Sequence, residues 1–302
     1  MNKIFTKMPF LAALLLCCAV SCYAQNSPLQ KTIENIIQGK RAKIGVAIIP
    51  EEGRKYVEIN GDTQYPMQSV YKFHLALAIL DMTDKGKISL DKDIYVTDED
   101  LNPDTYSPML KKYTGGKAYI PVRELLRYAI TESDNNASDI LFKLAGGPTQ
   151  VNHYISSTGV NNINIAATEK KMRRVPLAQY SNWSTPMAAA KLLEKFYGGE
   201  LLMESSNSLL WDMLAKTVTG PKRIKALLPQ EAVVAHKTGT GIREKGVMSA
   251  CNDIGIVKFP DGRHFTIAVF ITGSKESDET NERIIGEIAK AAWDYYKDTG
   301  AL

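Results

Sequence analysis

The chain contains 302 residues, of which 44% are apolar, 8% aromatic and 23% charged. These values are close to the average of globular proteins, which excludes a wholly disordered chain, a collagen and a coiled coil. The formal net charge of +4 is too small, and the basic residues are too dispersed, to indicate a nucleic-acid partner. The length predicts two domains or one large composite domain.

Residues 1–24 have the pattern of an export signal. Two lysines precede a short apolar run over residues 10–20, and Cys22 and Ala24 provide small residues before a cleavage point. The run is shorter than the ~20 residues that a membrane-spanning helix needs. We therefore predict cleavage near Ala24 and a periplasmic protein without stable membrane association. Lipid attachment at Cys22, which would anchor the protein, is the alternative.

Removal of this signal leaves Cys251 as the only cysteine. An exported protein with one cysteine forms no internal disulfide and depends on its hydrophobic core for stability. No pattern in the sequence indicates an oligomer, so a monomer is expected.

The predicted elements begin and end with strands and contain a long helical segment between them. A helix over residues 30–38 precedes strands over 44–50 and 55–60, which Glu51-Glu52-Gly53 joins as a hairpin. Helical spacing and capping signals then predict helices over 71–82, 121–131 and 138–145. Strands over 232–237, 247–259 and 264–272 and a final amphipathic helix over 282–296 complete the chain.

This order predicts an α/β (α+β) fold of two lobes. We expect the terminal strands to share one antiparallel sheet with flanking helices, so residues 25–65 and 218–302 form an α/β lobe. Residues 66–217 form an all-α lobe, and the active site lies in the cleft between the two lobes.

Metal and phosphate chemistry find no support in the sequence. The four histidines are scattered without metal-ligand spacing, and neither a G-x-S-x-G elbow nor a Walker loop occurs. A serine nucleophile would therefore need a base other than histidine, and lysine is the obvious candidate.

Ser69 and Lys72 form an S-x-x-K pattern near the start of a predicted helix. Residues three positions apart lie on the same helical face, so the amine can reach the hydroxyl, and partial burial would help the lysine to lose its proton. The pattern occurs again at Ser89 and Lys92, where charged neighbours and a glycine predict a solvated loop.

Two further patterns follow in the chain. Ser133-Asp134-Asn135 is either a helix-capping turn or a site in which Ser133 relays a proton and Asn135 donates to a substrate amide. Lys237-Thr238-Gly239 ends a β-rich run; it is either an ordinary strand end or a carboxylate-binding strand whose glycine lets the substrate approach the backbone. The three patterns together, in this order, favour the catalytic interpretations.

With these three motifs the mature chain resembles the class A serine β-lactamases of the penicilloyl-serine transferase group. The resemblance implies a β-lactamase/transpeptidase-like fold and a small β-lactam substrate, with no cofactor and no metal. Tyr106 matches the tyrosine at the cleft entrance, and Arg223 matches an arginine that helps to hold the substrate carboxylate in some members.

The resemblance also assigns a role to Glu169, which lies 35 residues after Asp134. Family members that hydrolyse their acyl-enzyme carry a glutamate at this distance, on a loop. Three departures follow: Arg173 replaces the usual asparagine, and Ala167 and Asn182 replace the partners of an Arg–Asp salt bridge. We therefore expect a loop folded differently from that of most members, as in a divergent branch that favours cephalosporins.

By this resemblance Ser69 attacks the β-lactam and Lys72 or Glu169 serves as base. The backbone N–H groups of Ser69 and Thr240 form the oxyanion hole, Ser133 protonates the leaving nitrogen and Glu169 activates the hydrolytic water. The implied substrate-binding residues are Tyr106, Asn135, Lys237, Thr238, Gly239, Thr240 and Arg223. The alternatives are a D-Ala-D-Ala carboxypeptidase or transpeptidase, and a β-lactam sensor domain that does not release the drug.

Overall fold

The computed structural model describes residues 27–51, 55–113, 115 and 117–298. The predicted export signal, the lipidation alternative at Cys22 and the turn at Glu52-Gly53 lie outside the described residues. None of the helices within the described ranges is long and apolar enough to cross a membrane.

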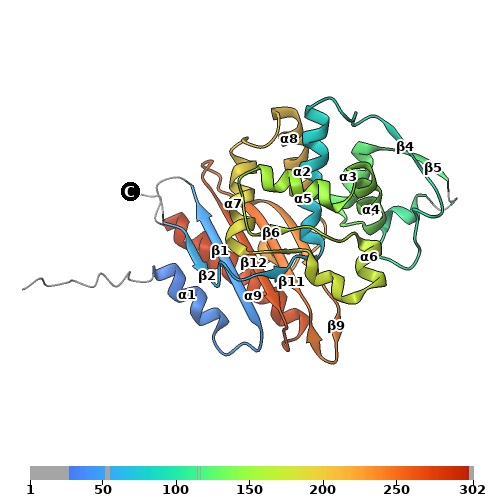
Figure 1. Cartoon of the computed structure of the whole chain (residues 1–302). Helices are drawn as coiled ribbons and strands as arrows, with labels where there is room; N and C mark the ends of the chain where they lie inside the picture. Colours follow the sequence, from blue (N-terminus) through green and yellow to red (C-terminus); the bar gives the residue numbers. More distant parts are fainter. Residues whose placement is uncertain (1–26, 52–54, 114, 116, 299–302) are drawn as a thin grey trace, which may run out of the picture.

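A five-stranded antiparallel sheet forms the centre of one lobe, with the strand order β2-β1-β12-β11-β8 (Figure 1). Alternating buried residues along β1, β11 and β12 supply apolar side chains to both faces. The strands are β1 (Lys43–Pro50), β2 (Val57–Ile59), β8 (Val233–Thr240), β11 (Cys251–Lys258) and β12 (His264–Thr272). The first and last parts of the chain therefore share one sheet, because β1 pairs with β12 along its whole length.

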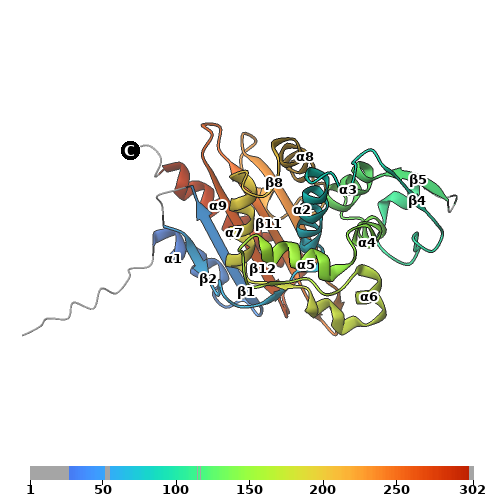
Figure 2. The ribbon, with the colours of Figure 1, turned by 45° about the horizontal axis from the view of Figure 1, so that its top comes forward.

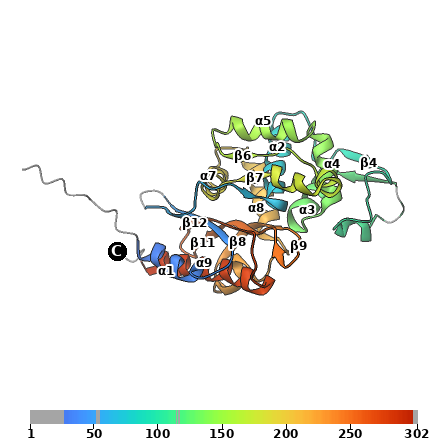
Figure 3. The ribbon, with the colours of Figure 1, turned by 60° about the horizontal axis from the view of Figure 1, so that its bottom comes forward.

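Helices α1 (Pro28–Ile37) and α9 (Asp278–Asp298) cover one face of this sheet, together with the 3₁₀ turn η4 (Ile224–Leu227). Figure 3 shows α1 and α9 side by side beneath the strands. Their apolar faces pack on β1, β11 and β12 in one hydrophobic cluster, which includes Trp293 and the buried thiol of Cys251. Burial raises the pKa of this thiol to about 11.

The opposite face of the sheet carries the helical lobe. Helix α7 (Pro186–Tyr197) packs on β1 and β12, and α8 (Glu204–Ala215) packs against β8. The remaining helices are α2 (Tyr71–Asp84), α3 (Val122–Thr131), α4 (Asn135–Leu144), α5 (Pro148–Ser157) and α6 (Glu169–Arg174). Figure 2 shows α2 among α3, α4, α5 and α8. Its first ten residues are all buried, which explains why this helix is apolar on every side.

Short strands and 3₁₀ turns complete the fold. The strands are β3 (Tyr65–Pro66), β4 (Asp93–Val96), β5 (Ala118–Pro121), β6 (Ile163–Asn164), β7 (Trp183–Ser184), β9 (Arg243–Glu244) and β10 (Val247–Met248). The turns are η1 (Gln68–Val70), η2 (Pro108–Lys111) and η3 (Pro176–Ser181). Strands β6, β7 and β3 form a small sheet that links the segment before Glu169 to the segment before Ser69.

Two predicted elements have different bounds in the structure. The single strand predicted over 247–259 is wrong: β10 pairs with β9, and the chain then enters the main sheet as β11. Met248 forms a bridge with Ser274, so a contact between distant segments interrupts the strand. The helix predicted over 138–145 begins at Asn135, because the Asp134 carboxylate accepts a hydrogen bond from the N–H of Ala137 and caps it.

The predicted architecture, an antiparallel sheet with flanking helices and an all-α lobe, is confirmed. The residue boundaries proposed for the two lobes stay a prediction.

Candidate active site

Ser69 and Lys72 lie where the chain enters the central helix. Ser69 belongs to the 3₁₀ turn η1, and Lys72 belongs to the first turn of α2. Their spacing places both side chains on one side of this continuous helical segment. The second S-x-x-K pattern is different: Ser89 and Lys92 are exposed in a turn, as predicted.

The amine of Lys72 connects the first motif to the second motif and to Glu169. Its Nζ donates to the carbonyl oxygen of Ser133 at 2.7 Å and to Oδ1 of Asn135 at 2.6 Å. The same atom lies 3.4 Å from Oε1 of Glu169. Burial lowers the pKa of Lys72, and the nearby carboxylates of Glu169 and Asp134 oppose this shift. The structure thus brings together four of the predicted residues around one buried amine.

The second motif is both a helix cap and a junction. Asp134 caps α4, and its carboxylate also accepts a hydrogen bond from Ser107 Oγ at 2.8 Å, which ties the motif to the segment carrying Tyr106. Ser133 has a positive φ of 59°, a left-handed conformation that is uncommon outside glycine and asparagine. The capping and catalytic interpretations are therefore compatible, because Asp134 serves as the cap while its two neighbours contact the lysines.

Lys237 joins the third motif to the second motif. It lies in β8, the edge strand of the main sheet, and its fully buried Nζ donates to Ser133 Oγ at 2.9 Å. Burial lowers the pKa of Lys237 well below its usual value, and the positive charge of Lys72 acts in the same direction. His236 faces the other side of the sheet, where its Nδ1 lies 3.0 Å from the buried carboxylate of Asp253.

Gly239 brings β8 against the segment that carries Ser69. A Cβ at this position would lie 2.2 Å from the carbonyl oxygen of Met67. From the neighbouring strand β11, the side-chain amide of Asn252 donates to the carbonyl oxygens of Pro66 and Met67 at 2.8 and 3.2 Å. Close packing of the strand on the turn before Ser69 therefore requires this glycine, whatever the substrate needs. Asn252 was not singled out in the sequence because nothing local marks its role.

Glu169 is the first residue of α6, and its carboxylate faces the buried lysine. Tyr71 donates from its hydroxyl to Oε1 of Glu169 at 2.9 Å. The carboxylate of Asp139 on α4 accepts from the backbone N–H groups of Glu169 and Lys170 at 2.7 and 2.8 Å. Burial raises the pKa of Asp139 to about 6. Asp139 and Tyr71 thus hold the glutamate in place, and Asp139 follows Asn135 by one helical turn.

Asn182 replaces the missing salt bridge of the Glu169 loop, which we define as residues 163–184. Its Oδ1 accepts from the N–H groups of Ala166 and Ala167 at 2.8 and 2.9 Å, and its Nδ2 donates to the carbonyl oxygen of Ala167 at 2.8 Å. Asn182 is fully buried. One amide therefore closes the loop by direct contact with backbone groups, with no charge on either partner.

Arg223 lies behind the third motif, nearly buried. Its guanidinium donates to the carbonyl oxygens of Gly239 and Asn252 at 3.3 and 2.9 Å and to Thr240 Oγ1 at 2.8 Å. Its Nε lies 3.4 Å from a carboxylate oxygen of Glu282. The arginine is close to the end of β8, as the resemblance predicted, but protein groups already occupy its donors.

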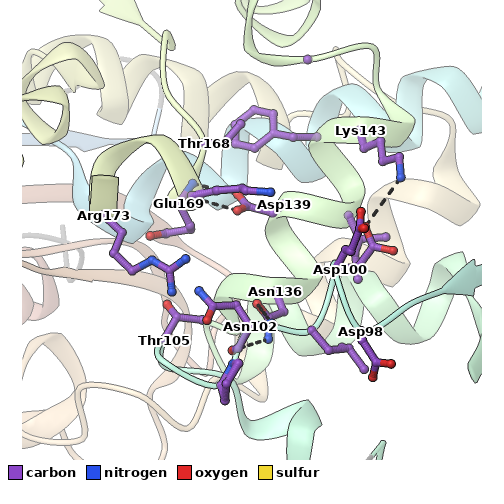
Figure 4. Close-up of a pocket in the computed structure, with 17 residues that line it drawn as sticks. Asp98, Asp100, Asn102, Thr105, Asn136, Asp139, Lys143, Thr168, Glu169 and Arg173 are labelled. Carbon is purple, nitrogen blue, oxygen red and sulfur yellow. Dashed lines mark hydrogen bonds and ion pairs between the residues drawn. The ribbon is translucent and has the colours of Figure 1, made fainter. Parts of the chain in front are cut away.

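A cavity of about 630 Å³ lies beside the lysines, between α4, α6 and the segment that precedes Tyr106. We call it the lateral cavity; it is lined by residues 98–103, Thr105, α4 and the stretch from Thr168 to Arg173. Figure 4 shows Glu169 and Arg173 on one side of it and Asp98 and Asp100 on the other. Tyr106 itself is 57% exposed, and its carbonyl oxygen accepts a hydrogen bond from the N–H of Asn135.

No cluster of histidine, cysteine and acidic side chains suitable for a metal ion occurs in the part of the chain that the structure describes. The chemistry available at the site is therefore that of a hydroxyl, two buried amines, a carboxylate and backbone N–H groups.

Comparisons with known proteins agree with this geometry. The model of the family described as "Beta-lactamase enzyme family" matches residues 28–296. The extended-spectrum β-lactamase PER-1 of Pseudomonas aeruginosa is 41% identical over 90% of this chain and 88% of its own length.

Two solved structures have the same fold as this chain. The crystal structure of the TLA-3 extended-spectrum β-lactamase has a TM-score of 0.87 at 46% identity and covers 89% of this chain and 98% of its own. A class A β-lactamase from Bacteroides cellulosilyticus DSM 14838 has a TM-score of 0.86 at 36% identity, covering 90% of this chain and 100% of its own.

Proposed function

Because this chain belongs to the β-lactamase enzyme family, in its class A branch, we propose that Ser69 opens the β-lactam ring of cephalosporins and penicillins and that Glu169 drives the release of the product. The observation that carries this proposal is the position of Lys72. Its Nζ contacts the second motif and also lies 3.4 Å from the Glu169 carboxylate, so both steps share one buried centre.

In the first step Ser69 Oγ attacks the carbonyl carbon of the strained cyclic amide. The serine proton passes to Lys72, or to Glu169 through a water molecule; both routes are open for class A enzymes. The lowered pKa of Lys72 supports the first route, because an amine that loses its proton near neutral pH can accept one. The short separation of Lys72 and Glu169 supports the second route equally.

The tetrahedral intermediate needs donors for its oxyanion, and we assign the N–H groups of Ser69 and Thr240 to this role. In the antiparallel pair of β8 and β11, the N–H of Gly241 donates to Ala250 O at 2.8 Å. Alternation along the strand then turns the N–H of Thr240 toward the free edge of β8, which faces Ser69. Loss of one such donor raises the barrier of comparable enzymes by about 3 kcal/mol.

Ser133 then protonates the ring nitrogen as the carbon–nitrogen bond breaks. The hydrogen bond that Lys237 donates to Ser133 Oγ supports this role, since a cation beside the hydroxyl makes it a better proton donor. Lys237 and Thr238 also bind the carboxylate that β-lactams carry. Arg223 contributes by orienting the Thr240 hydroxyl, to which it donates at 2.8 Å.

In the second step Glu169 removes a proton from a water molecule, and the resulting hydroxide equivalent attacks the ester carbonyl and releases Ser69. The hydrogen bond from Tyr71 and the grip of Asp139 on the loop backbone support a fixed carboxylate orientation. The unusual course expected for the Glu169 loop, and the preference for cephalosporins that it implies, stay predictions.

The test of this proposal is multiple turnover followed by capture of the acyl-enzyme. The purified protein is mixed with a chromogenic cephalosporin, and we expect hydrolysis well beyond one equivalent. A burst of one equivalent that then stops would instead indicate a peptidase or a sensor domain.

The Glu169→Ala variant separates the two steps. We expect it to accumulate a covalent adduct on Ser69, visible as a mass increase of the intact protein, with turnover lower by at least about a hundredfold. Lys170→Ala, which removes the exposed neighbour on the same helix, serves as the control. Free turnover of Glu169→Ala at the native rate would show that another group activates the water.

We further propose that the chain is exported to the periplasm with its signal removed near Ala24. The charged start and short apolar run of residues 1–24 support this proposal. Mass spectrometry of the protein from a periplasmic extract tests it, because lipid attachment at Cys22 would give a different N-terminus and a larger mass.

A further inference from the structure

The lateral cavity is continuous with the place where the acyl group would sit. Glu169 lines this cavity and is also the ion-pair partner of Lys72. Thr105, on the opposite wall, accepts a hydrogen bond from Nδ2 of Asn135 at 2.8 Å. If Asn135 holds the amide of the substrate side chain, the atoms beyond that amide enter the lateral cavity. This inference therefore rests on the proposed function.

Arg173 is the unengaged cation of this cavity. It follows Glu169 by four positions on α6, so both side chains lie on the same face of the helix. In Figure 4 its guanidinium points across the cavity toward Thr105. Within the described residues no hydrogen bond or ion pair occupies it, although it is exposed and lies on the cavity wall.

The acidic residues of the cavity do not neutralise this arginine. Asp139 is bound to the backbone of α6, and Asp100 accepts from Thr97 and lies 3.6 Å from Lys143. Asp98 lies on the far side of the cavity (Figure 4). The end of the cavity nearest the acyl group is therefore the end with an available positive charge.

We propose that Arg173 is a specificity residue that binds a carboxylate carried by the acyl side chain of the β-lactam in the lateral cavity. A guanidinium matches a carboxylate with two parallel N–H donors, which gives both attraction and orientation. A substrate with an ammonium group at the same position meets repulsion from this arginine.

Three penicillins that differ at one carbon isolate the effect. Benzylpenicillin carries no charge on the α-carbon of its side chain, carbenicillin carries a carboxylate there, and ampicillin carries an ammonium. The measured quantity is the ratio of kcat/KM for carbenicillin to kcat/KM for benzylpenicillin. This ratio cancels any loss that a substitution causes for all substrates alike.

We expect Arg173→Gln to lower this ratio by about fivefold, as for a partly exposed ion pair, and Arg173→Lys to retain most of it. Arg173→Glu should lower it further and raise the corresponding ratio for ampicillin. Arg174→Gln is the matched control: it removes the same charge from the next residue, which does not line the lateral cavity, and should leave the ratio unchanged.

Two outcomes would overturn the inference. One is an unchanged ratio in both Arg173→Gln and Arg173→Glu, including the case of an equal loss for all three penicillins, which would assign Arg173 to the hydrolytic step. The other is an equal effect of Arg174→Gln, which would indicate a general field of the basic helix. Failure of the native protein to hydrolyse benzylpenicillin would contradict the proposed function itself.

Discussion

The wall of the site that carries the three motifs is held by burial, whereas the wall that carries Glu169 is held by side-chain hydrogen bonds to backbone groups. Lys72 and Lys237 are fully buried in the helix and sheet cores. The Glu169 loop depends instead on Asn182 at its base and on Asp139 at the start of α6. The buried wall tolerates little change, since any substitution there disturbs a close-packed core.

The loop wall can change its fastening without moving its glutamate. An uncharged asparagine stands where a salt bridge is usual in the family, and the Glu169 carboxylate still lies within 3.4 Å of Lys72. A hydrogen bond from a neutral amide avoids the cost of burying two charges, which explains why the replacement is possible. Three substitutions sharpen this contrast.

The largest effect is expected on the buried wall. Lys72→Ala removes the amine that contacts Ser133, Asn135 and Glu169, and should lower kcat/KM by about a thousandfold. The measurement is steady-state hydrolysis of a chromogenic cephalosporin, with circular dichroism to verify folding. Lys85→Ala, at the exposed end of the same helix, is the control and should retain native activity. Comparable loss in both variants would point to helix stability instead of chemistry.

On the loop wall, Asn182→Ala should lower the free energy of unfolding by about 3 kcal/mol, because it leaves three backbone groups of Ala166 and Ala167 without partners. Urea unfolding measures this change. Asn161→Ala removes an exposed asparagine from the same region and should have little effect. A small loss for Asn182→Ala would mean that water or a shifted loop satisfies those groups.

The smallest effect concerns the pH dependence of the loop. The pKa of Asp139 is raised to about 6, so the native protein binds this proton more tightly than the unfolded chain does. The stability contributed by this protonation is complete below about pH 4 and is lost as the pH rises through about 6.

Asp139→Asn cannot titrate, so its unfolding free energy should fall by about 2 kcal/mol less than that of the native protein between about pH 4 and 7. Unfolding curves at several pH values give both slopes, and Asp98→Asn, an exposed acid of the lateral cavity, is the control. Identical slopes in native protein and Asp139→Asn would contradict the raised pKa.

The elements predicted from the sequence were those with a strong local signal. Helical spacing marked α2 and α9, and β-rich runs marked β1 and β12. The split of β10 from β11 could not be predicted, because it depends on the pairing of Met248 with Ser274 and of β10 with β9. No pattern in the run itself marks that change of partner.

The amino-acid order alone determined the three motifs and the distance to Glu169, since spacings along a helix or strand decide which side chains share a face. Only the tertiary structure decided how these pieces are held. Asp139 grips the loop, Asn182 closes it, and Arg173 is left free in the lateral cavity. These roles come from contacts between segments far apart in the chain, and hydrogen bonds of that kind leave no periodic mark in a sequence.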